Sequence, residues 1–398
     1  MSIPQQSPSR YRILILSHSA VVDVYQDKLR YLAREHDLEI TLVVPHVFPE
    51  AGGVVQAHLG DGSYTVVPLH GRLARKGPQS KYTLRGLRRL MKRLQPHVLH
   101  LEEEPESLIS LQAIRAALAL RQPPKIVAFS WRNMIFPFSH WPWYKPKRIV
   151  LDLIQRMCLP HVDALICGSH EGPSTFASLG VTCPMHIIPQ YGIDPARYSP
   201  EGPRIDIQST YNIGNNELLV GFVGRIMPMK GLDTLLEACS LCGNNVHCVV
   251  IGRGDTDWLR TVAERTGMTS RLTIIDGLAP ADVPSAMRAL DVMVLPSKTT
   301  AQWREQFGRV IIEAMACGLP VVGSSSGEIP YVIGDAGLVF PEGDAKALAS
   351  CIEQMSDPEA RATIRRLGLE RVEAHYTNER IAGQIAQVYR QVLTNAGV

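Results

Sequence analysis

The sequence predicts an α/β protein with two doubly wound domains, each a parallel sheet covered by helices on both faces. Three observations favour this fold class. Short apolar runs alternate with helical patterns along most of the chain, which is the order of elements in a parallel sheet. The runs 13–16 and 126–129 are continuously apolar, as expected of strands buried on both faces. The length of 398 residues, at about 150 residues per domain, corresponds to two or three domains.

The two series of elements lie on either side of a proline-rich segment. In the first series, strands are expected at 12–16, 40–44, 65–68, 97–100 and 125–129, and helices at 25–35, 81–94 and 108–121. In the second, strands are expected at 218–224, 246–252, 272–275, 292–295 and 320–323. Several prolines and a glycine break the periodicity around residues 195–205. We therefore expect an N-terminal domain over 1–197 and a C-terminal domain over 198–375.

The last segment, residues 376–398, is expected to be a helix. Apolar residues recur on one face of the stretch 379–393, at Ile381, Ile385, Val388, Tyr389 and Val392. An ordinary closing helix and a helix that packs back on the N-terminal domain both explain this face. The prediction adopted is the helix that crosses back.

Composition and charge exclude several classes of protein. Hydrophobic residues at 45% and charged residues at 20% are typical of globular proteins and exclude disorder. The 41 basic and 38 acidic residues are too balanced to indicate nucleic acid as the partner of the whole chain. No apolar run approaches the roughly 18–20 residues that cross a bilayer, and residues 1–10 do not resemble an export signal. The eight cysteines are therefore expected to be reduced thiols in a cytoplasmic protein.

The most informative chemical feature is a pair of glutamates, Glu305 and Glu313, eight residues apart. If a helix begins near Gly308, Glu305 lies on the preceding loop and Glu313 on the second turn. The free N–H groups of Gly308, Arg309 and Val310 would then form an anion site suited to a diphosphate. One carboxylate would accept hydrogen bonds from sugar hydroxyls and the other from a ribose. A surface glutamate followed by a helix glutamate explains the same spacing without a ligand.

A second feature is a buried strand that ends in Gly224 and Arg225, with Lys230 five residues beyond the arginine. Open parallel sheets bind ligands at the carboxyl ends of their strands. An arginine fork and a lysine point charge at this place suit a pyrophosphate. Two solvated cations at the end of a strand are the structural alternative.

These signals occur with others in one order along the second half of the chain. The set is Gly224-Arg225 with Lys230-Gly231, the strand end Gly252, Arg253 and Gly254, the triplet Leu295-Pro296-Ser297, the pair Glu305 and Glu313, and the run from Glu313 to Val322. The strand end at Gly252 lacks the third glycine of the dinucleotide fingerprint and is weak evidence by itself. Together, however, the signals resemble the C-terminal domain of the family 4 retaining glycosyltransferases.

The resemblance implies two facing Rossmann-like domains, the GT-B type fold, with the donor bound mainly by the C-terminal domain. It also implies that Arg225 and Lys230 neutralise the donor diphosphate, that Glu305 holds hydroxyls of the transferred sugar, and that Glu313 binds the ribose. The expected donor residues are Gly224, Arg225, Lys230, Gly252, Arg253, Gly254, Leu278, Glu305, Phe307, Gly308, Arg309, Val310 and Glu313, of which Arg225, Lys230 and Glu305 are the catalytic ones.

The chemistry that the resemblance implies is retention of anomeric configuration by front-face attack, with no cofactor and no essential metal. Stabilisation of the leaving diphosphate by the two cations and the helix start is then the main catalytic device. The predicted function is transfer of a sugar from a UDP- or GDP-sugar to a hydroxyl acceptor in surface polysaccharide or glycolipid biosynthesis. The alternatives are a nucleotide-sugar epimerase or phosphorylase on the same fold, or a non-catalytic sugar-binding scaffold.

The N-terminal half departs from the commonest family pattern. Many members have a glycine-rich loop after the first strand, and many have a histidine after the strand at 125–129; this chain has neither. The residues expected to contact the acceptor are Ser17, His18, Glu103, Trp131, Arg132 and Asn133. A strand-to-helix cap at Ser17 and a buried Trp131 beside a turn at Asn133 are the structural alternatives.

Three adjacent glutamates, Glu102, Glu103 and Glu104, follow another expected strand of the N-terminal half. If desolvated, adjacent carboxylates raise each other's pKa, and such a group orients an acceptor hydroxyl. Alternatively, the three acids form the N-terminus of a helix with Pro105 in its first turn.

The strongest charge asymmetry lies between Arg72 and Leu101. This segment has no acid and nine basic residues, namely Arg72, Arg75, Lys76, Lys81, Arg85, Arg88, Arg89, Lys92 and Arg93. Its expected helix carries apolar residues on one face, from Leu84 to Leu94, and cations elsewhere. The pattern suits a peripheral helix on an anionic inner leaflet, where a lipid-linked acceptor would lie. A helix packed on the core with a solvated basic face explains it too.

A zinc site is not predicted, although Cys239, Cys242 and Cys248 are close in sequence. Zinc needs four converging ligands. Cys239 is expected at the end of a helix and Cys248 within a strand, so the two thiols are not expected to converge.

Overall fold

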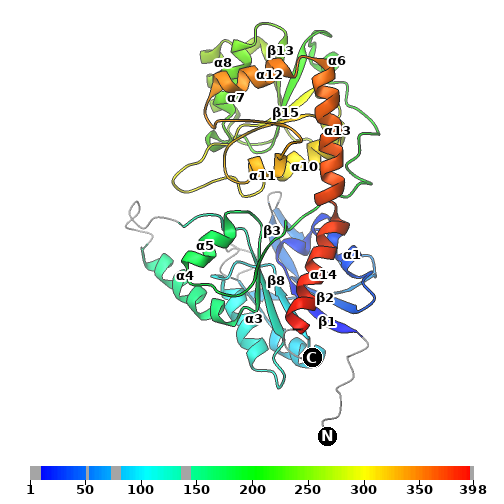
Figure 1. The fold of residues 1–398 in the computed structure, drawn as a ribbon, viewed down its shortest axis with the longest axis vertical. Helices are drawn as coiled ribbons and strands as arrows, with labels where there is room; N and C mark the ends of the chain where they lie inside the picture. The colour runs from blue at the N-terminus through cyan, green and yellow to red at the C-terminus, as the bar shows by residue number, and fades with distance from the viewer. Residues whose placement is uncertain (1–9, 51–52, 73–81, 136–144, 395–398) are drawn as a thin grey trace. The chain divides into compact units, whose positions relative to one another are not determined.

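The chain folds into two compact α/β units. The computed structural model describes residues 10–50, 53–72, 82–135 and 145–394. One unit is Met1–Gly192 with Asn378–Val398, and the other is Ile193–Thr377 (Figure 1). The expected limits were residues 197 and 375. The observed limits differ because Ile193 N–H donates to the Tyr376 carbonyl at 2.7 Å and pairs with Thr377, which ties both segments to the second unit.

The first unit contains a seven-stranded parallel sheet in the order β11-β10-β9-β8-β1-β2-β5. Its strands are β1 Tyr11–Leu16, β2 Leu38–Pro45, β5 Thr65–Leu69, β8 Val98–Leu101, β9 Lys125–Ser130, β10 Ala164–Cys167 and β11 Met185–Ile187. Two antiparallel pairs lie outside this sheet, β3 Val47–Glu50 with β4 Gly53–Gln56, and β6 Gly71–Arg72 with β7 Thr83–Leu84. Residues 13–16 of β1 and 126–129 of β9 are buried, as the sequence predicts.

Helices cover both faces of this sheet. They are α1 Asp27–Leu32, α2 Leu87–Leu94, α3 Leu108–Leu118, α4 Lys145–Cys158, α5 Gly172–Ser178 and α14 Asn378–Thr394, with short 3-10 turns at Ser19–Val21, Asp23–Tyr25 and Leu159–His161. The β1-to-β2 connection runs along the sheet in the opposite direction from the β8-to-β9 connection. Because such crossovers are right-handed, α1 and α3 cover opposite faces.

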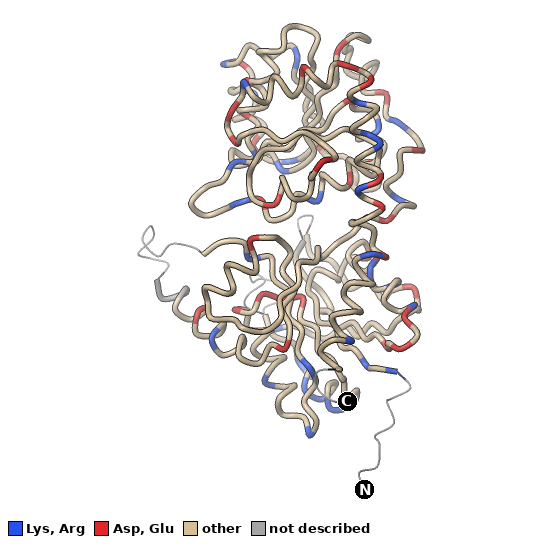
Figure 2. Tube along the Cα trace, in the orientation of Figure 1, with Lys and Arg blue, Asp and Glu red and all other residues tan. Residues whose placement is uncertain are grey.

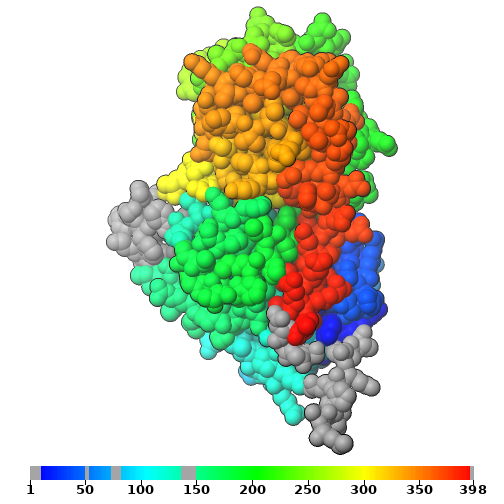
Figure 3. All heavy atoms as spheres, viewed as in Figure 1, coloured from blue at the N-terminus to red at the C-terminus, as the bar shows by residue number. Residues whose placement is uncertain are grey.

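The C-terminal helix α14 crosses back to the first unit, which confirms the prediction. It packs beside α1, as the red and blue segments show (Figures 1 and 3). Its residues Ile381, Ile385 and Tyr389 are part of the hydrophobic core of this unit.

The basic helix differs from the prediction in its extent. The expected helix spanned residues 81–94, but residues 83–84 form β7 and α2 begins only after Gly86, whose φ of +83° stops an earlier start. Residue 81 lies outside the described residues, as do Arg75 and Lys76. The apolar residues Leu87, Leu90 and Met91 are buried in the core. A membrane therefore has no access to the apolar face of α2, which corrects that part of the prediction.

The second unit contains a six-stranded parallel sheet in the order β14-β13-β12-β15-β16-β17. Its strands are β12 Leu218–Val223, β13 Val246–Ile251, β14 Leu272–Ile275, β15 Val292–Leu295, β16 Val321–Ser324 and β17 Leu338–Phe340. Its helices are α6 Ile207–Tyr211, α7 Leu232–Leu241, α8 Thr256–Thr266, α9 Val283–Met287, α10 Arg309–Ala316, α11 Ile329–Ile333, α12 Ala345–Gln354 and α13 Pro358–His375, with 3-10 turns at Pro228–Lys230 and Thr269–Arg271. The strand order reverses beside β12, where open parallel sheets bind ligands.

Charges of both signs are distributed over both units (Figure 2). Neither unit as a whole presents a field of one sign, in keeping with the net charge of +3. In the part of the chain that the structure describes, no helix combines the length and the hydropathy that crossing a membrane requires.

Candidate functional site

The expected donor residues of the second unit lie at one edge of its sheet. Gly224 and Arg225 follow β12, Gly252 follows β13, Leu278 follows β14 and Glu305 is in the loop after β15. Because all of these strands are parallel, their carboxyl ends share an edge. The structure therefore brings the predicted donor residues to the same end of the unit.

The glycines after β12 and β13 let two loops run backbone against backbone. Gly252 has a φ of +154°, and a Cβ there would lie 1.8 Å from the Gly224 carbonyl oxygen. A Cβ on Gly254 would lie 2.1 Å from the Ile226 carbonyl oxygen, and these two residues pair as a bridge. The contact between the loops thus accounts for the glycines that the sequence singled out.

The two arginines beside these glycines stay in solvent. Arg225 is exposed at the end of β12. Arg253 is 73% exposed and lies 3.4 Å from the Asp276 carboxylate. Their guanidinium groups are accessible to an anion at the edge of the sheet.

Lys230 and Glu305 form the centre of the candidate site. The Lys230 ammonium donates to Glu305 Oε2 at 2.7 Å, and the buried Ser297 hydroxyl donates to the same oxygen at 2.9 Å. The Trp303 ring lies 4.6 Å from the Lys230 ammonium. The sequence assigned no role to Ser297 or Trp303; the signals for them are the Leu295-Pro296-Ser297 triplet and a tryptophan two residues before Glu305.

Two close backbone contacts hold the Lys230 turn against the loop after β15. Gly231 has a φ of +71°, and a Cβ there would lie 1.8 Å from the Pro296 carbonyl oxygen. The Lys298 N–H donates to the Met229 carbonyl at 2.9 Å. These contacts fix the position of the Lys230 ammonium relative to Glu305.

The helix expected near Gly308 begins there, so this prediction is confirmed. Gly308 is the N-cap of α10 with a φ of +73°, and Arg309 is its first helical residue. Phe307 is buried edge-on against Tyr376, with ring centroids 6.0 Å apart. Its side chain belongs to the core, so only its backbone can reach a ligand. Val310 is half-buried in the first turn.

Glu313 lies on the second turn of α10, as predicted, but it already has protein partners. Arg309 Nε lies 2.9 Å from its carboxylate, and Tyr198 hydrogen-bonds to it. Burial raises the pKa of Glu313, and Arg309 partly offsets this effect. Tyr198 is distant in sequence, and no spacing pattern predicted it.

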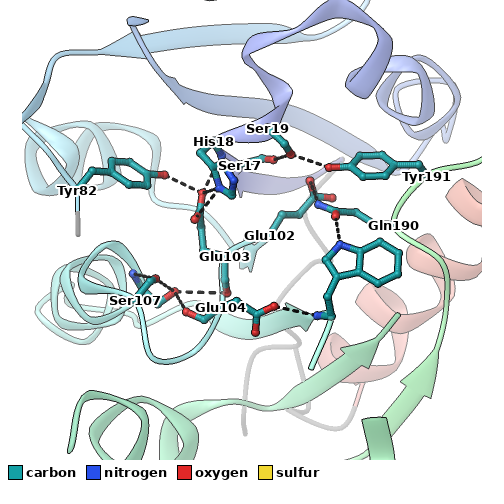
Figure 4. Close-up of polar contacts among 12 residues, drawn as sticks. Ser17, His18, Ser19, Tyr82, Glu102, Glu103, Glu104, Ser107, Gln190 and Tyr191 are labelled. Atoms are coloured by element: carbon teal, nitrogen blue, oxygen red, sulfur yellow. Dashed lines mark hydrogen bonds and ion pairs between the residues drawn. The ribbon is translucent and has the colours of Figure 1, made fainter. Parts of the chain in front are cut away.

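In the first unit, Glu103 holds His18 in a fixed orientation (Figure 4). Its carboxylate accepts from the His18 backbone N–H at 2.7 Å and lies 2.9 Å from the imidazole Nδ1. The buried Tyr82 hydroxyl donates to the same carboxylate at 2.7 Å. The His18 side chain is 14% exposed, so its ring edge reaches the surface while its partners are buried.

Glu102 is buried in an ion pair. It pairs with the buried Lys28, whose ammonium also donates to the Gln190 carbonyl at 2.8 Å. Burial raises the pKa of Glu102, but Lys28 and His100 outweigh burial, and the pKa lies below its usual value. The side chain of Ser17 hydrogen-bonds to Glu102 and is fully buried. Ser17 is thus held inside the first unit, and its contact with an acceptor stays a prediction.

Glu104 turns to the opposite side from Glu103 (Figure 4). It accepts hydrogen bonds from the Ser130 hydroxyl and from the Trp131 N–H, the latter at 2.9 Å. Burial and the nearby Glu106 raise its pKa to about 7. The pKa values of Glu102 and Glu104 are thus shifted in opposite directions, because their side chains enter different networks.

The three glutamates are not the start of a helix, so that alternative is wrong. The helix α3 begins at Leu108, and its N-cap is Ser107, whose hydroxyl accepts from the Ser110 N–H at 3.1 Å. Pro105 also precedes the helix. Ser107 was the stronger N-cap signal in the sequence.

The side chains that follow β9 are mostly buried in the first unit. Arg132 is buried and pairs with Glu106 and Gln155. Asn133 is 5% exposed. Both side chains are buried in this structure, and their contacts with an acceptor stay predictions. Trp131 is half-buried and donates its indole N–H to the Gln190 side chain at 2.7 Å.

Cys239 and Cys248 meet, contrary to the expectation that they would not. The two thiols hydrogen-bond, and this contact together with burial raises the pKa of Cys239 well above its usual value. All eight cysteines are free thiols. Within the described ranges, no cluster of three or more His, Cys, Asp or Glu side chains could hold a metal ion.

Comparisons with known sequences concern mainly the second unit. The model of the family described as "Glycosyl transferases group 1" matches residues 204–369. A D-inositol 3-phosphate glycosyltransferase of Mycolicibacterium vanbaalenii is 31% identical over 205 residues, 48% of this chain and 44% of that protein. One of Corynebacterium glutamicum is 28% identical over 245 residues, 53% and 56% of the two chains. The matched regions thus span about half the length of these curated relatives.

Solved structures match the fold of nearly the whole chain. Sucrose-phosphate synthase from Thermosynechococcus elongatus has a TM-score of 0.71 at 21% identity and covers 97% of this chain and 100% of its own. Anabaena Alr3699/HepE in complex with UDP has a TM-score of 0.69 at 19% identity and covers 96% and 100%. The two parallel sheets with their helices are therefore the GT-B fold.

Proposed function

Since residues 204–369 of this chain belong to the glycosyl transferases group 1 family, we propose that the protein is a retaining glycosyltransferase. It transfers a sugar from a nucleotide diphosphate sugar to a hydroxyl acceptor, and the second unit binds the donor. The observation that carries this proposal is the Lys230–Glu305–Ser297 cluster at the carboxyl edge of the second sheet.

The proposed diphosphate site uses the positive groups at this edge. Arg225 is exposed and offers a planar fork, and Lys230 offers a point charge. The N-terminus of α10, which begins after Gly308, adds the partial positive charge of a helix start. These groups supply the stabilisation of the leaving diphosphate that a metal ion supplies in other enzymes. We therefore expect turnover to be insensitive to chelators.

The proposed role of Glu305 is to hold hydroxyls of the transferred sugar. Lys230 and Ser297 both donate to Oε2, which fixes the plane of the carboxylate. When a donor binds, the Lys230 ammonium can bridge Glu305 and a phosphate oxygen, since an ammonium has three donors. The Lys230–Glu305 pair thereby positions both the sugar and the leaving diphosphate. We assign no protein base, because leaving phosphate accepts the acceptor proton in front-face attack.

Glu313 is the proposed ribose contact, and Gly252, Arg253, Gly254 and Leu278 the proposed surroundings of the base. The Arg309 contact keeps the Glu313 carboxylate in place on α10. UDP-glucose is the first donor to test, because Anabaena Alr3699/HepE has been solved in complex with UDP-glucose. The proposal includes both UDP-sugars and GDP-sugars as donors.

On the acceptor side, the first unit offers His18. Glu103 and Tyr82 hold its ring, so His18 can receive or donate one hydrogen bond at a fixed place. The exposed Arg72, Arg85, Arg88, Arg89, Lys92 and Arg93 would attract an anionic membrane surface, consistent with a lipid-linked acceptor. Two of the solved structures that share this fold are enzymes of lipopolysaccharide synthesis, WaaB and WaaG.

The test compares two lysines of the same edge. Lys230→Ala should lower transfer from UDP-glucose by about 10²–10³-fold, because it removes one group that stabilises the leaving diphosphate. Lys298→Ala is the matched control, since Lys298 pairs with Asp233 at 2.8 Å in the loop after β15. It should leave the rate within about twofold.

Binding is measured separately by thermal shift with UDP, GDP and ADP. A bound nucleoside diphosphate raises the melting temperature in proportion to its affinity. Equal transfer rates and equal shifts in the Lys230 and Lys298 variants would mean that the proposed donor site is wrong. Donor binding without turnover on a broad acceptor panel would support the non-catalytic scaffold instead.

A further inference from the structure

The helix α4 presents large apolar side chains to solvent. Ile149, Val150, Leu153 and Met157 are 42–62% exposed, whereas Ile154 on the same helix is 5% exposed. At 3.6 residues per turn, the four exposed positions fall within an arc of about 100°. We call these four residues the α4 stripe. Single exposed apolar residues are common, but a stripe that a helix turns away from the core marks an interaction surface.

The charged residues carried by α4 and by the neighbouring helices α3 and α2 are nearly all basic. Arg156 is exposed, about 20° around the helix from the edge of the stripe. The helix α3 packs against α4; it carries the exposed Arg115, and the exposed Arg121 follows its end. The helix α2 packs against α3. The half-buried Asp152 is the one acid in these three helices.

The basic face of α2 extends this surface. Arg88, Arg89, Lys92 and Arg93 are exposed on it. The chain of contacts from α2 through α3 to α4 places the α2 helix on the same side of the sheet as the α4 helix (Figure 1). The α2 helix supplies charge but no free apolar side chain, because its apolar residues are in the core. The α4 stripe supplies the exposed apolar side chains that α2 lacks.

We propose that the α4 stripe docks on an anionic lipid surface. Aliphatic side chains enter the boundary between headgroups and acyl chains, while arginine and lysine side chains contact lipid phosphates. Arg156 can do both, since its stem lies along the stripe and its head reaches the phosphates. A second copy of this chain fits less well, because a symmetric contact would bring the same arginines together. The inference rests on α4 and its neighbours and does not depend on the proposed transfer reaction.

The experiment is flotation of the full chain with vesicles of phosphatidylcholine and phosphatidylglycerol at moderate salt, with pure phosphatidylcholine for comparison. The wild type should float with the anionic vesicles. The pair Ile149→Ser and Leu153→Ser should weaken binding by about tenfold or more, since two aliphatic side chains no longer leave water. The matched control Leu241→Ser, at a site 51% exposed in the second unit, should bind as the wild type does. Arg156→Glu should also weaken binding.

Three results would overturn the proposal. The first is that the wild type does not float with anionic vesicles, and the second is that the double serine variant floats as fully as the wild type. The third is that the wild type is a dimer in solution and the double serine variant is a monomer. The last would assign the α4 stripe to a contact between copies of this chain. The thermal shift with UDP checks folding and separates the two proposals, because the double serine variant should keep it whether or not the vesicles bind.

Discussion

Each unit contains a lysine–glutamate pair next to the carboxyl end of a strand, and the two pairs differ in exposure. The Lys230 and Glu305 side chains are 17% and 10% exposed, and those of Lys28 and Glu102 are 2% and 3% exposed. A pair at the surface can exchange part of its contact for a ligand. A buried pair cannot, because breaking it leaves a desolvated charge. The same two side chains therefore suit binding in the second unit and folding in the first.

The largest effect is expected when a substitution breaks the buried pair of Lys28 and Glu102. Lys28→Ala leaves the Glu102 carboxylate buried without its cation, so the free energy of unfolding should fall by about 3–5 kcal/mol. Lys230→Ala should lower it by less, because the Lys230 and Glu305 side chains are in partial contact with solvent and Ser297 still donates to Glu305. Urea unfolding of both variants measures the difference.

The control for Lys28 removes both charges at once. The double variant Lys28→Met with Glu102→Leu should recover much of the lost stability, because no unpaired charge remains. Similar losses for the Lys28 and Lys230 single variants would show that the two pairs do not differ in the way proposed here.

The sequence predicted where the candidate residues lie in the fold better for the second unit than for the first, and the reason is physical. Glu305, Gly308 and Glu313 lie within nine residues, so helix geometry alone places them. In the first unit, His18 meets Glu103 across 85 residues and Tyr82 meets it across 21. No local periodicity encodes such contacts, because they depend on which strands pair.

A second expected effect concerns Gly231, which fixes the Lys230 turn. Gly231→Ala forces an L-residue into a positive φ and places its Cβ against the Pro296 carbonyl. Gly267→Ala is the matched control, because its φ of +69° is nearly the same and no atom lies within 4 Å of the added Cβ. We expect Gly267→Ala to cost about 1–2 kcal/mol and Gly231→Ala about 1–3 kcal/mol more.

Gly231→Ala should also weaken the UDP-dependent thermal shift, whereas Gly267→Ala should not. Equal costs and equal shifts would mean that the loop after β15 moves away freely and does not fix the Lys230 ammonium. The sequence marked Gly231 through the family resemblance, but only the structure shows the backbone oxygen that excludes a side chain there.

The acids of the first unit show a further limit of sequence reasoning. Glu102, Glu103 and Glu104 are identical in type and adjacent, yet the pKa of Glu102 is lowered and that of Glu104 is raised. The sequence predicted carboxylates at the end of a strand, and this is where they lie. It could not predict that Lys28 from α1 would neutralise one of them and that Glu106 would repel another.

The smallest expected effect tests this difference through pH. The folded-state pKa of Glu104, about 7, lies above its ordinary value of 4.5, so the folded state binds a proton where the unfolded state has lost it. The free energy of unfolding should therefore fall as pH rises from about 4.5 to 7, by at most about 1.4 kcal/mol per pH unit. His100 acts in the opposite direction, since burial lowers its pKa to about 4 and its contribution to stability is lost as pH falls below about 6.5.

The pH dependence of wild-type unfolding combines the effects of Glu104 and His100. The informative quantity is therefore the difference in the free energy of unfolding between wild type and Glu104→Gln across this pH range. That difference should change between pH 5 and pH 7.5, and a constant difference would mean that the fold does not raise the pKa of Glu104.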